Sequence, residues 1–424
     1  MRVLIWFCVI VLANSAQSVM AHQEGGALAA LSAGARSYRL LATQISPLEK
    51  LDASALSANQ RPSQNLKIAY ARFAHAQYQQ ALSALAPLAL AIDELLAKPN
   101  SANLAKARKA WLAARPAYLY TEVFRFYEGP IDADFGVDQA TGLAAQTPKN
   151  YESRINAWPL NEAVLDYVKG APSAGLVQNL ALPLSATNIL ALDQTADESD
   201  VTTGWHAIEF LLWGQDFASN GPGDRAVSDF ADTSETNARR RLLLQLLLSM
   251  LAQDLSALAN AWDLARSDSY ASKFIQIDAY EAIGRMLTGA AMLAGNELAS
   301  QRLTVALDSG TQEDEHSCFS DSSSSDFRAG VAGISILFGD DGAGLLSALE
   351  KLDAPAAKRL RTALATAEKA VAKIAAPFDQ VLTSKVDSAK RNDAEQAALA
   401  LQHLAKEIAS AGRSFGVLVS VPGL

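Results

Sequence analysis

Apolar residues recur along this chain at intervals of three and four positions, which is the spacing of one face of an α-helix. In the segment Leu66–Leu96 this pattern is carried by Tyr78, Leu82, Leu85, Ala89, Ile92 and Leu96. Runs in which apolar and polar residues alternate, as in a β-strand, are hard to find. The pattern therefore predicts an all-α protein. Further helices are predicted over Leu104–Phe126, Asn237–Ala265, Tyr280–Leu307, Ala354–Ala375 and Ala394–Ser410.

Turn-forming residues divide the helical pattern into two halves. The run Asn220-Gly221-Pro222-Gly223 is the strongest candidate boundary, since a long apolar helix is predicted on either side of it. Each half contains a long helix, a loop and a second long helix that carries an unexpected acidic residue. This layout predicts two four-helix-bundle domains related by an internal duplication, the first over residues 22–220 and the second over residues 221–424.

The first residues have the pattern of a secretory signal peptide. Met1-Arg2 supplies a positive charge, Val3–Ala13 is a short apolar run, and Val19-Met20-Ala21 offers the small residues that a signal peptidase reads. We therefore expect residues 1–21 to be cleaved on export. No later segment is expected to span a membrane in the mature chain, and Leu242–Leu251 comes closest.

The net charge narrows the classes of partner, and the cysteine content limits the possible disulfides. The full chain carries a formal net charge of −9, which argues against nucleic acid and anionic lipid because both require clustered Lys and Arg. The same balance is compatible with cation binding. Of the two cysteines, Cys8 lies in the signal segment, so Cys318 is left without a partner for an internal disulfide.

The segment from Gly204 to Gly214 places a histidine and a glutamate three residues apart in otherwise apolar surroundings. At helical spacing His206, Glu209 and Trp213 share one face, so a base and a carboxylate point together into the apolar interior. Burying either group unpaired costs about 1–3 kcal/mol or more, so each needs a partner, a metal or a catalytic role. The alternative is a core histidine hydrogen-bonded to its neighbour.

A second polar stripe lies on the predicted helix Leu104–Phe126. Its members step by four and three residues and combine aromatic with charged types: Trp111, Arg115, Tyr118, Glu122 and Arg125. The two arginines could clamp an anion or hold a carboxylate in place. The alternative is an Arg/Glu ladder of little consequence, which the interleaved aromatic residues disfavour. In the second half, Glu297 lies on one face of the predicted helix Tyr280–Leu307.

Two downstream blocks are dense in polar and aromatic residues. Arg154–Glu162 contains Trp158, and Gln312–Asp321 contains His316, Ser320 and Asp321. Carboxylates together with an imidazole are ligands that iron, zinc or calcium accept. From residue type alone, a solvated loop with a capping Ser or Asp is the better interpretation of the second block.

Taken together, these segments resemble the imelysin family of exported bacterial proteins. The family's GxHxxE motif corresponds to Gly204–Glu209, and its usual Leu-Leu-Trp-Gly tail follows. Further blocks match in order along the chain: Thr121–Phe126 with Gly129–Asp132, Ile155–Leu160 and Gln312–Asp321. The chain looks most similar to the iron-regulated branch of the family.

The resemblance implies two helical bundles with a site between them, a location in the periplasm or at the outer membrane, a role in iron acquisition and a peptidase assignment. One departure concerns Ser322–Asp326, where the family commonly has a run that contains a His and an Arg. An activity that depends on those two side chains would be affected.

The residues give limited support to a peptidase. A zincin requires His-Glu-x-x-His, but Ala207 stands where the glutamate should be and Phe210 where the second histidine should be. A carboxypeptidase-type pair of His206 and Glu209 would need a remote third histidine, for which His316 is the best candidate. The sequence therefore leaves open whether the protein is an enzyme.

We expect a protein of bacterial iron uptake that binds a metal or an iron-containing ligand between two helical bundles. Iron or zinc would be held by His206, Glu209, Glu122 and Glu297, and ligand-binding residues would be Glu122, Arg125, Trp158, Arg302, Ser320 and Asp321. One alternative is a metallopeptidase with His206 and Glu209 as its catalytic residues. A second is a structural or partner-binding envelope protein in which Arg125 and Arg302 neutralise the acids in a metal-free polar network. Other envelope proteins of iron uptake are candidate partners.

Overall fold

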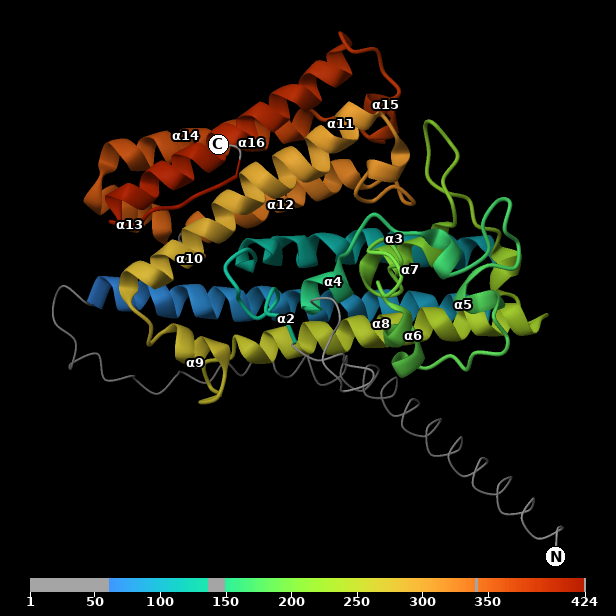
Figure 1. Ribbon diagram of the computed structural model, residues 1–424. Coiled ribbons are helices and arrows are strands. Elements are labelled where there is room, and N and C mark those ends of the chain that lie inside the picture. Colours follow the sequence, from blue (N-terminus) through green and yellow to red (C-terminus); the bar gives the residue numbers. More distant parts are fainter. Residues whose placement is uncertain (1–60, 136–148, 340–341, 423–424) are drawn as a thin grey trace, which may run out of the picture. The chain divides into compact units, whose positions relative to one another are not determined.

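The computed structural model describes residues 61–135, 149–339 and 342–422 of the chain. Within these ranges the regular elements are helices, and the only strand-like feature is an isolated bridge between Val168 and Ala171 (Figure 1). The predicted all-α fold is therefore confirmed. The predicted signal peptide, residues 1–21, lies outside the described residues.

A first group of helices is built around the long helix α2. It packs against α3 and α8, and the short helix α7 contacts both α3 and α8 (Figure 1). The predicted apolar face of α2 is buried in these contacts. The elements of this part are α2 (Arg61–Ala97), α3 (Ser101–Leu119), the 3₁₀ helix η2 (Tyr120–Phe124), α4 (Tyr151–Ile155), η3 (Glu162–Val164), α5 (Gly175–Gln178), α6 (Ala186–Leu192), α7 (Gly204–Trp213), η4 (Val227–Phe230), α8 (Glu235–Ala261) and α9 (Tyr270–Phe274).

A second group follows in the last third of the chain. Its first three elements continue one another as a single rod, because the backbone stays right-handed helical at both junctions. The rod packs against α16, and α14 contacts α12, α13 and α16 (Figure 1). The elements are α10 (Ala279–Met292), the π-helical segment η5 (Leu293–Thr304), α11 (Val305–Ser309), η6 (Gln312–Asp314), α12 (Ser323–Phe338), α13 (Leu345–Leu352), α14 (Ala354–Lys373), α15 (Asp379–Leu382) and α16 (Ala389–Ser414).

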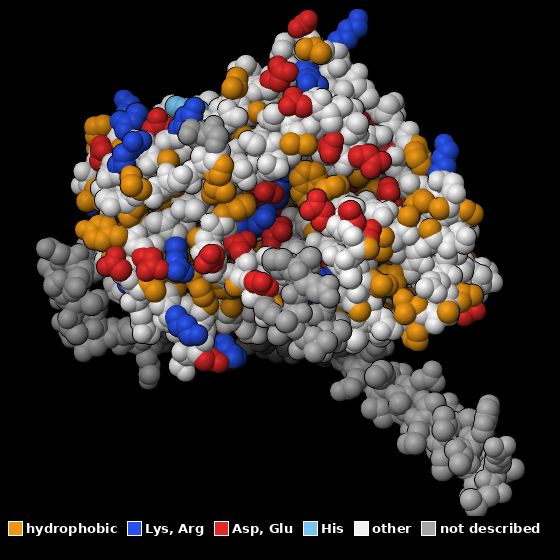
Figure 2. Space-filling view, in the orientation of Figure 1, with side chains coloured by type: hydrophobic (Ala, Val, Ile, Leu, Met, Phe, Trp, Pro, Cys, Tyr) orange, Lys and Arg blue, Asp and Glu red, His pale blue; other side chains and the backbone are white. Residues whose placement is uncertain are grey.

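The two groups meet where α12 packs against α3 and η2, and where α10 packs against α2 and η2. Glycines permit the close approach. A Cβ on Gly289 of α10 would lie 2.3 Å from the Val123 carbonyl oxygen, and one on Gly333 of α12 would lie 3.0 Å from the Cα of Tyr120. Asp and Glu side chains gather along the middle of one face, over the region where the two groups meet (Figure 2).

The described residues all fall within one compact unit. The domain boundary predicted near Asn220 stays a prediction. Among the described helices, the division between the two groups falls after α9 and not at residue 220. The helix α8 follows residue 220 in the sequence, and yet it packs against α2 and α7. The predicted internal duplication is not confirmed.

Two helices are long and apolar enough to cross a membrane, namely α2 over Ser63–Ala97 and α8 over Glu235–Ala261. This finding corrects the expectation that no segment after the signal peptide has these properties. In α8, 72% of the most apolar window is buried inside the protein, and α8 packs against α2. Core packing therefore accounts for the apolar residues of α8.

The predicted helix Leu104–Phe126 changes its winding at Tyr120. The N–H of Tyr120 contacts the carbonyls of both Pro116 and Tyr118, and the chain continues as the tighter 3₁₀ helix η2. This helix ends at Phe124, where Arg125 becomes extended, and Phe126 follows with a φ of 71°. This tighter turn carries Glu122 and Arg125 into the buried contact between the two groups.

Candidate functional site

Gly204 determines how α7 begins, and α7 carries His206 and Glu209. The φ of Gly204 is 83°, in the left-handed region, and a Cβ here would lie 2.4 Å from the Ile155 carbonyl oxygen. Only glycine satisfies both conditions. The start of α7 is thereby held against α4, and every residue of α7 is buried. The glycine of the motif is therefore required by the backbone conformation and the close packing, and not by the chemistry of the site.

Glu209 accepts hydrogen bonds on both of its carboxylate oxygens. His206 Nδ1 lies 2.9 Å from Oε2, while Ser320 approaches Oε1 with its amide N–H at 2.9 Å and its hydroxyl at 2.6 Å. His206 and Glu209 are thus in contact, as their spacing predicted. Burial raises the pKa of Glu209 to about 7, although the hydrogen bonds from Ser320 act in the opposite direction.

The second ring nitrogen of His206 contacts Arg115. Arg115 Nη2 lies 3.2 Å from His206 Nε2. A guanidinium can only donate, so Nε2 accepts and the ring proton lies on Nδ1, facing Glu209. Burial, reinforced by the charge of Arg115, lowers the pKa of His206 well below its ordinary value. His206 is therefore a neutral imidazole whose two nitrogens are both used by the protein.

Arg115 connects His206 to other buried polar groups. Its Nη1 donates to Asn156 Oδ1 at 2.6 Å, and its Nη2 lies 3.4 Å from Asp326 Oδ2. Asn156 Nδ2 in turn donates to Glu122 Oε1 at 3.2 Å. The buried histidine and the predicted stripe on α3 and η2 thus belong to one continuous network.

Glu122 lies at the centre of a group of ion pairs. Arg302 donates to both of its oxygens, and Arg302 Nε lies 2.9 Å from Glu297 Oε1. Arg125 Nη1 is 3.3 Å from Glu152 Oε1 and 3.6 Å from Oε1 of both Glu122 and Glu297. Although burial acts to raise it, the two arginines hold the pKa of Glu297 below its ordinary value. These contacts show the pairing of Arg125 and Arg302 with acidic residues that was one alternative from the sequence.

The residues expected to bind metal are not gathered into one ligand set. Among the described residues, only Asp216, Asp321 and Asp379 form a group of three or more candidate ligands whose atoms all lie within 4.8 Å of one another. Arg302 pairs with two members of the expected set, and its charge would repel a cation. Of the expected set, His206 and Glu209 pair with each other, and Glu122 and Glu297 pair with Arg302. Metal binding by these four residues stays a prediction.

His316 lies beside His206 and is buried, although the sequence favoured a solvated loop here. The two ring centroids are 4.9 Å apart, and the Trp158 ring centroid is 5.2 Å from that of His316. His316 Nδ1 lies 2.7 Å from Asp326 Oδ2, which also accepts a hydrogen bond from Ser317. His316 Nε2 is buried and has no hydrogen-bond partner. Burial lowers the pKa of His316 well below its ordinary value, so its Nε2 offers a free lone pair.

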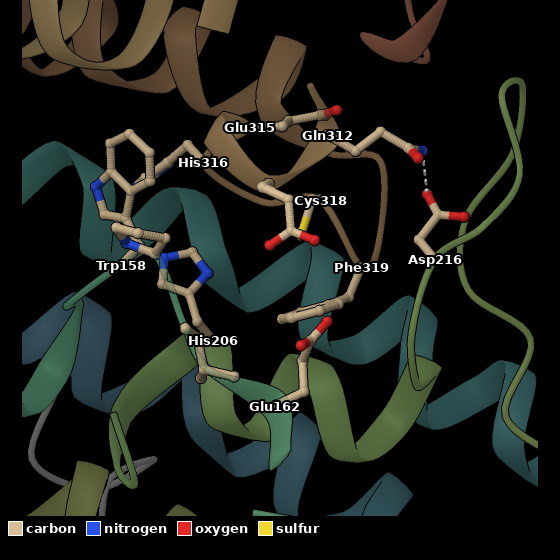
Figure 3. A pocket seen from close by; sticks show the side chains of 12 residues that line it. Trp158, Glu162, His206, Asp216, Gln312, Glu315, His316, Cys318 and Phe319 are labelled. Carbon is tan, nitrogen blue, oxygen red and sulfur yellow. Dashed lines mark hydrogen bonds between the residues drawn. The ribbon is translucent and has the colours of Figure 1, made fainter. Parts of the chain in front are cut away.

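A small cavity of about 40 Å³ lies against these side chains. Figure 3 shows the two histidines and Trp158 at one side of it and Asp216 at the other, with Cys318 between them. A cavity of this volume holds an ion with a few waters or a small molecule, and it is far too small for haem. Its remaining lining residues are Pro159, Leu160, Glu162, Gln312, Glu313, Glu315 and Phe319.

Cys318 is the one thiol in the lining of this cavity. Burial raises the pKa of Cys318 well above its ordinary value, and the nearby Glu209 carboxylate acts in the same direction. The thiol is therefore protonated near neutral pH and is a poor nucleophile.

The predicted site residues occupy different places in this arrangement. Ser320 contacts Glu209 and Trp158 lines the cavity, whereas Asp321 lies with Asp216 and Asp379. The sequence analysis missed the contributions of Asn156, Glu315, Asp326 and Asp379. The first of these lies in the matched block Ile155–Leu160, but nothing in the sequence marks Asp379.

Three comparisons place the chain among known proteins. A family model described as Imelysin matches residues 74–408. Comparison with curated proteins gave no match.

Two solved structures are similar to this fold. One is an iron-regulated protein A precursor from Parabacteroides distasonis ATCC 8503, with a TM-score of 0.63 at 18% sequence identity, covering 85% of this chain and 97% of that one. The other is an imelysin-like protein from Psychrobacter arcticum 273-4, with a TM-score of 0.55 at 16% identity, covering 86% of this chain and 98% of that one. At sequence identities of 18% and 16%, the similarity shows the fold alone.

Proposed function

Because the chain belongs to the imelysin family, we propose that it is an exported component of bacterial iron uptake that binds a metal ion or a small iron-containing ligand as its cargo. The binding site is the cavity beside His206 and His316. The iron link is supported by the name of the P. distasonis relative, and export by the signal-peptide pattern of residues 1–21.

The observation that carries this proposal is the unpaired Nε2 of His316. Leaving a buried nitrogen without a hydrogen bond costs free energy, and a ligand bound to this nitrogen would remove that cost. The contact of Nδ1 with Asp326 fixes the ring and leaves the Nε2 lone pair free. Histidines that bind metals are commonly held in this way by a carboxylate. We expect His316 to supply the protein's nitrogen ligand.

The rest of the cavity suits a small cargo with some ligands of its own. His206 has both nitrogens engaged, so it positions Glu209 and borders the cavity rather than offering a free donor. Glu162 and Cys318 also line the cavity. One free imidazole leaves most of the coordination sphere to water or to a small chelator.

The geometry does not favour a peptidase. Glu209 accepts hydrogen bonds on both oxygens, and the nitrogens of His206 are occupied. Neither residue is free to activate water as a general base. The protonated thiol of Cys318 likewise gives no support to nucleophilic catalysis.

The proposal is tested by calorimetric titration of the protein with Fe(II) under anaerobic conditions and, separately, with Zn(II). We expect His316→Ala to weaken binding at least about tenfold, or about 1.4 kcal/mol, because it removes the free nitrogen. His403→Ala is the matched control, since His403 is exposed on α16, and it should bind like the wild type. Absence of binding by the wild type, or equal binding by His316→Ala, would contradict the proposal.

A further inference from the structure

Four carboxylates from three segments of the chain meet at the side of the cavity away from His206. Asp216 follows the end of α7, Glu315 and Asp321 lie between η6 and α12, and Asp379 is the first residue of α15. One oxygen from each of the three aspartates lies within 4.8 Å of the others. Glu315 lies against Asp379, and Figure 3 shows its carboxylate directed away from His206.

Most of these oxygens lack a partner. Both oxygens of Glu315, both of Asp321 and one of Asp379 are buried without a hydrogen bond. Glu315 is only 2% exposed and Asp379 is fully buried. Gln312 Nε2 donates to Asp216 and to Asp379, each at 3.0 Å. Among the described residues, no Lys, Arg or His forms an ion pair with any of the four.

The proximity of like charges is unfavourable without a counter-charge. Burial and the neighbouring Asp379 and Asp216 raise the pKa of Asp321 to about 8, and burial raises the pKa of Asp216 to about 6. Buried carboxylates of this kind must either keep protons or bind a cation. A cation bound between these oxygens would relieve the repulsion.

The spacing of the oxygens fits one ion. Two oxygens bound to the same Ca²⁺ at roughly 2.4 Å lie at most about 4.8 Å apart, which is the limit that the three aspartates meet. The donors are all oxygen, as hard cations prefer. Three carboxylates within this limit favour Ca²⁺ over Mg²⁺, because Mg²⁺ usually keeps several waters and takes only one or two carboxylates.

We propose that Asp216, Asp321 and Asp379, with Glu315 beside Asp379, hold one calcium-like divalent cation. The ion would join the chain after α7, the segment before α12 and the start of α15, so it would link the two helix groups beside the cavity. This site does not depend on the iron-binding proposal, since it uses different ligands and a different class of metal.

The test uses full-length protein stripped with EDTA and dialysed into metal-free buffer at pH 7.5. Thermal unfolding and calorimetry are then followed as CaCl₂ is added. We expect one Ca²⁺ per chain and a Tm that rises with Ca²⁺ concentration, because a ligand that binds only the folded state stabilises it. MgCl₂ at the same concentration should raise the Tm less, and an equal rise would overturn the preference for calcium.

Asp379→Asn should abolish both the Ca²⁺ heat and the Tm rise, and Asp321→Asn should do the same as an independent variant. Asp387→Asn removes the same charge from an exposed position eight residues beyond Asp379 and should respond like the wild type.

A Ca²⁺-dependent Tm rise that persists in both cluster variants would overturn the proposal by placing the ion elsewhere. So would a wild type that ignores Ca²⁺ while Asp379→Asn alone raises the Tm, because shared protons would then account for the cluster. Binding of Fe(II) by Asp379→Asn at wild-type strength would show that the two sites are separate.

Discussion

At the scale of single residues, two neighbouring imidazoles differ in what their nitrogens contact. His206 donates to Glu209 and accepts from Arg115, so its ring is fully used. His316 is held by Asp326 on one side and leaves Nε2 unpaired on the other. His206 therefore helps to hold the site together, whereas His316 offers a nitrogen that can bind a metal.

The raised pKa of Glu209 predicts a pH dependence of stability. The pKa of its carboxyl group is about 7 in the folded protein and near 4.5 when unfolded, so folding takes up a proton between these values. The contribution of Glu209 to stability is therefore present below about pH 4.5 and falls as pH rises towards 7. Glu209→Gln should lower the overall stability but flatten this part of the dependence.

The measurement is the free energy of unfolding by urea at intervals from pH 5 to pH 8, in the wild type and in Glu209→Gln. The difference between the two proteins isolates the titration of this carboxyl group from that of other groups. Parallel curves over the whole range would show that Glu209 does not titrate in this window.

At the scale of elements, the periodicity of apolar residues predicted the long helices but not how they end. The change to 3₁₀ winding at Tyr120 and the π-helical segment η5 both lie in elements that pack against other helices. The segment Gln312–Asp321 was interpreted as solvated because its residues are polar. The structure buries His316 and Ser320 there through contacts with residues more than a hundred positions away, which no local pattern encodes.

Two glycines of α10 give a matched test of the contact between the helix groups. A Cβ at Gly289 would lie 2.3 Å from the Val123 carbonyl oxygen, whereas one at Gly284 would meet nothing within 4 Å. Gly289→Ala should therefore lower the free energy of unfolding by about 1–3 kcal/mol, because the backbone at Val123 or at residue 289 would have to move to make room for the Cβ. Gly284→Ala should raise it by roughly 0.5–1 kcal/mol, because alanine favours a helix interior. Chemical denaturation measures both, and effects of the same sign would contradict the packing described.

At the scale of the whole molecule, the cavity lies where the two helix groups meet. His206 comes from α7 of the first group, and His316 is fixed by Asp326 of α12 in the second. The sequence predicted that His206 and Glu209 would lie in contact, and they do. It placed the predicted helix Asn237–Ala265 in the second half, whereas α8 packs against α2 and α7. A helix that is apolar on much of its surface suits either core, so its sequence alone does not decide between them. The sequence did raise the alternative that Arg125 and Arg302 neutralise the acids, and Arg302 does pair with Glu122.

The most direct test of the account is anomalous X-ray diffraction at the iron absorption edge, from crystals equilibrated anaerobically with Fe(II) and an excess of Ca²⁺. The calcium keeps the cluster of Asp216, Glu315, Asp321 and Asp379 filled, so iron there is disfavoured. The account predicts one iron peak in the cavity, at roughly 2.1 Å from His316 Nε2, and its loss in His316→Ala crystals. An iron peak only at the acidic cluster, or no peak in the cavity, would contradict it.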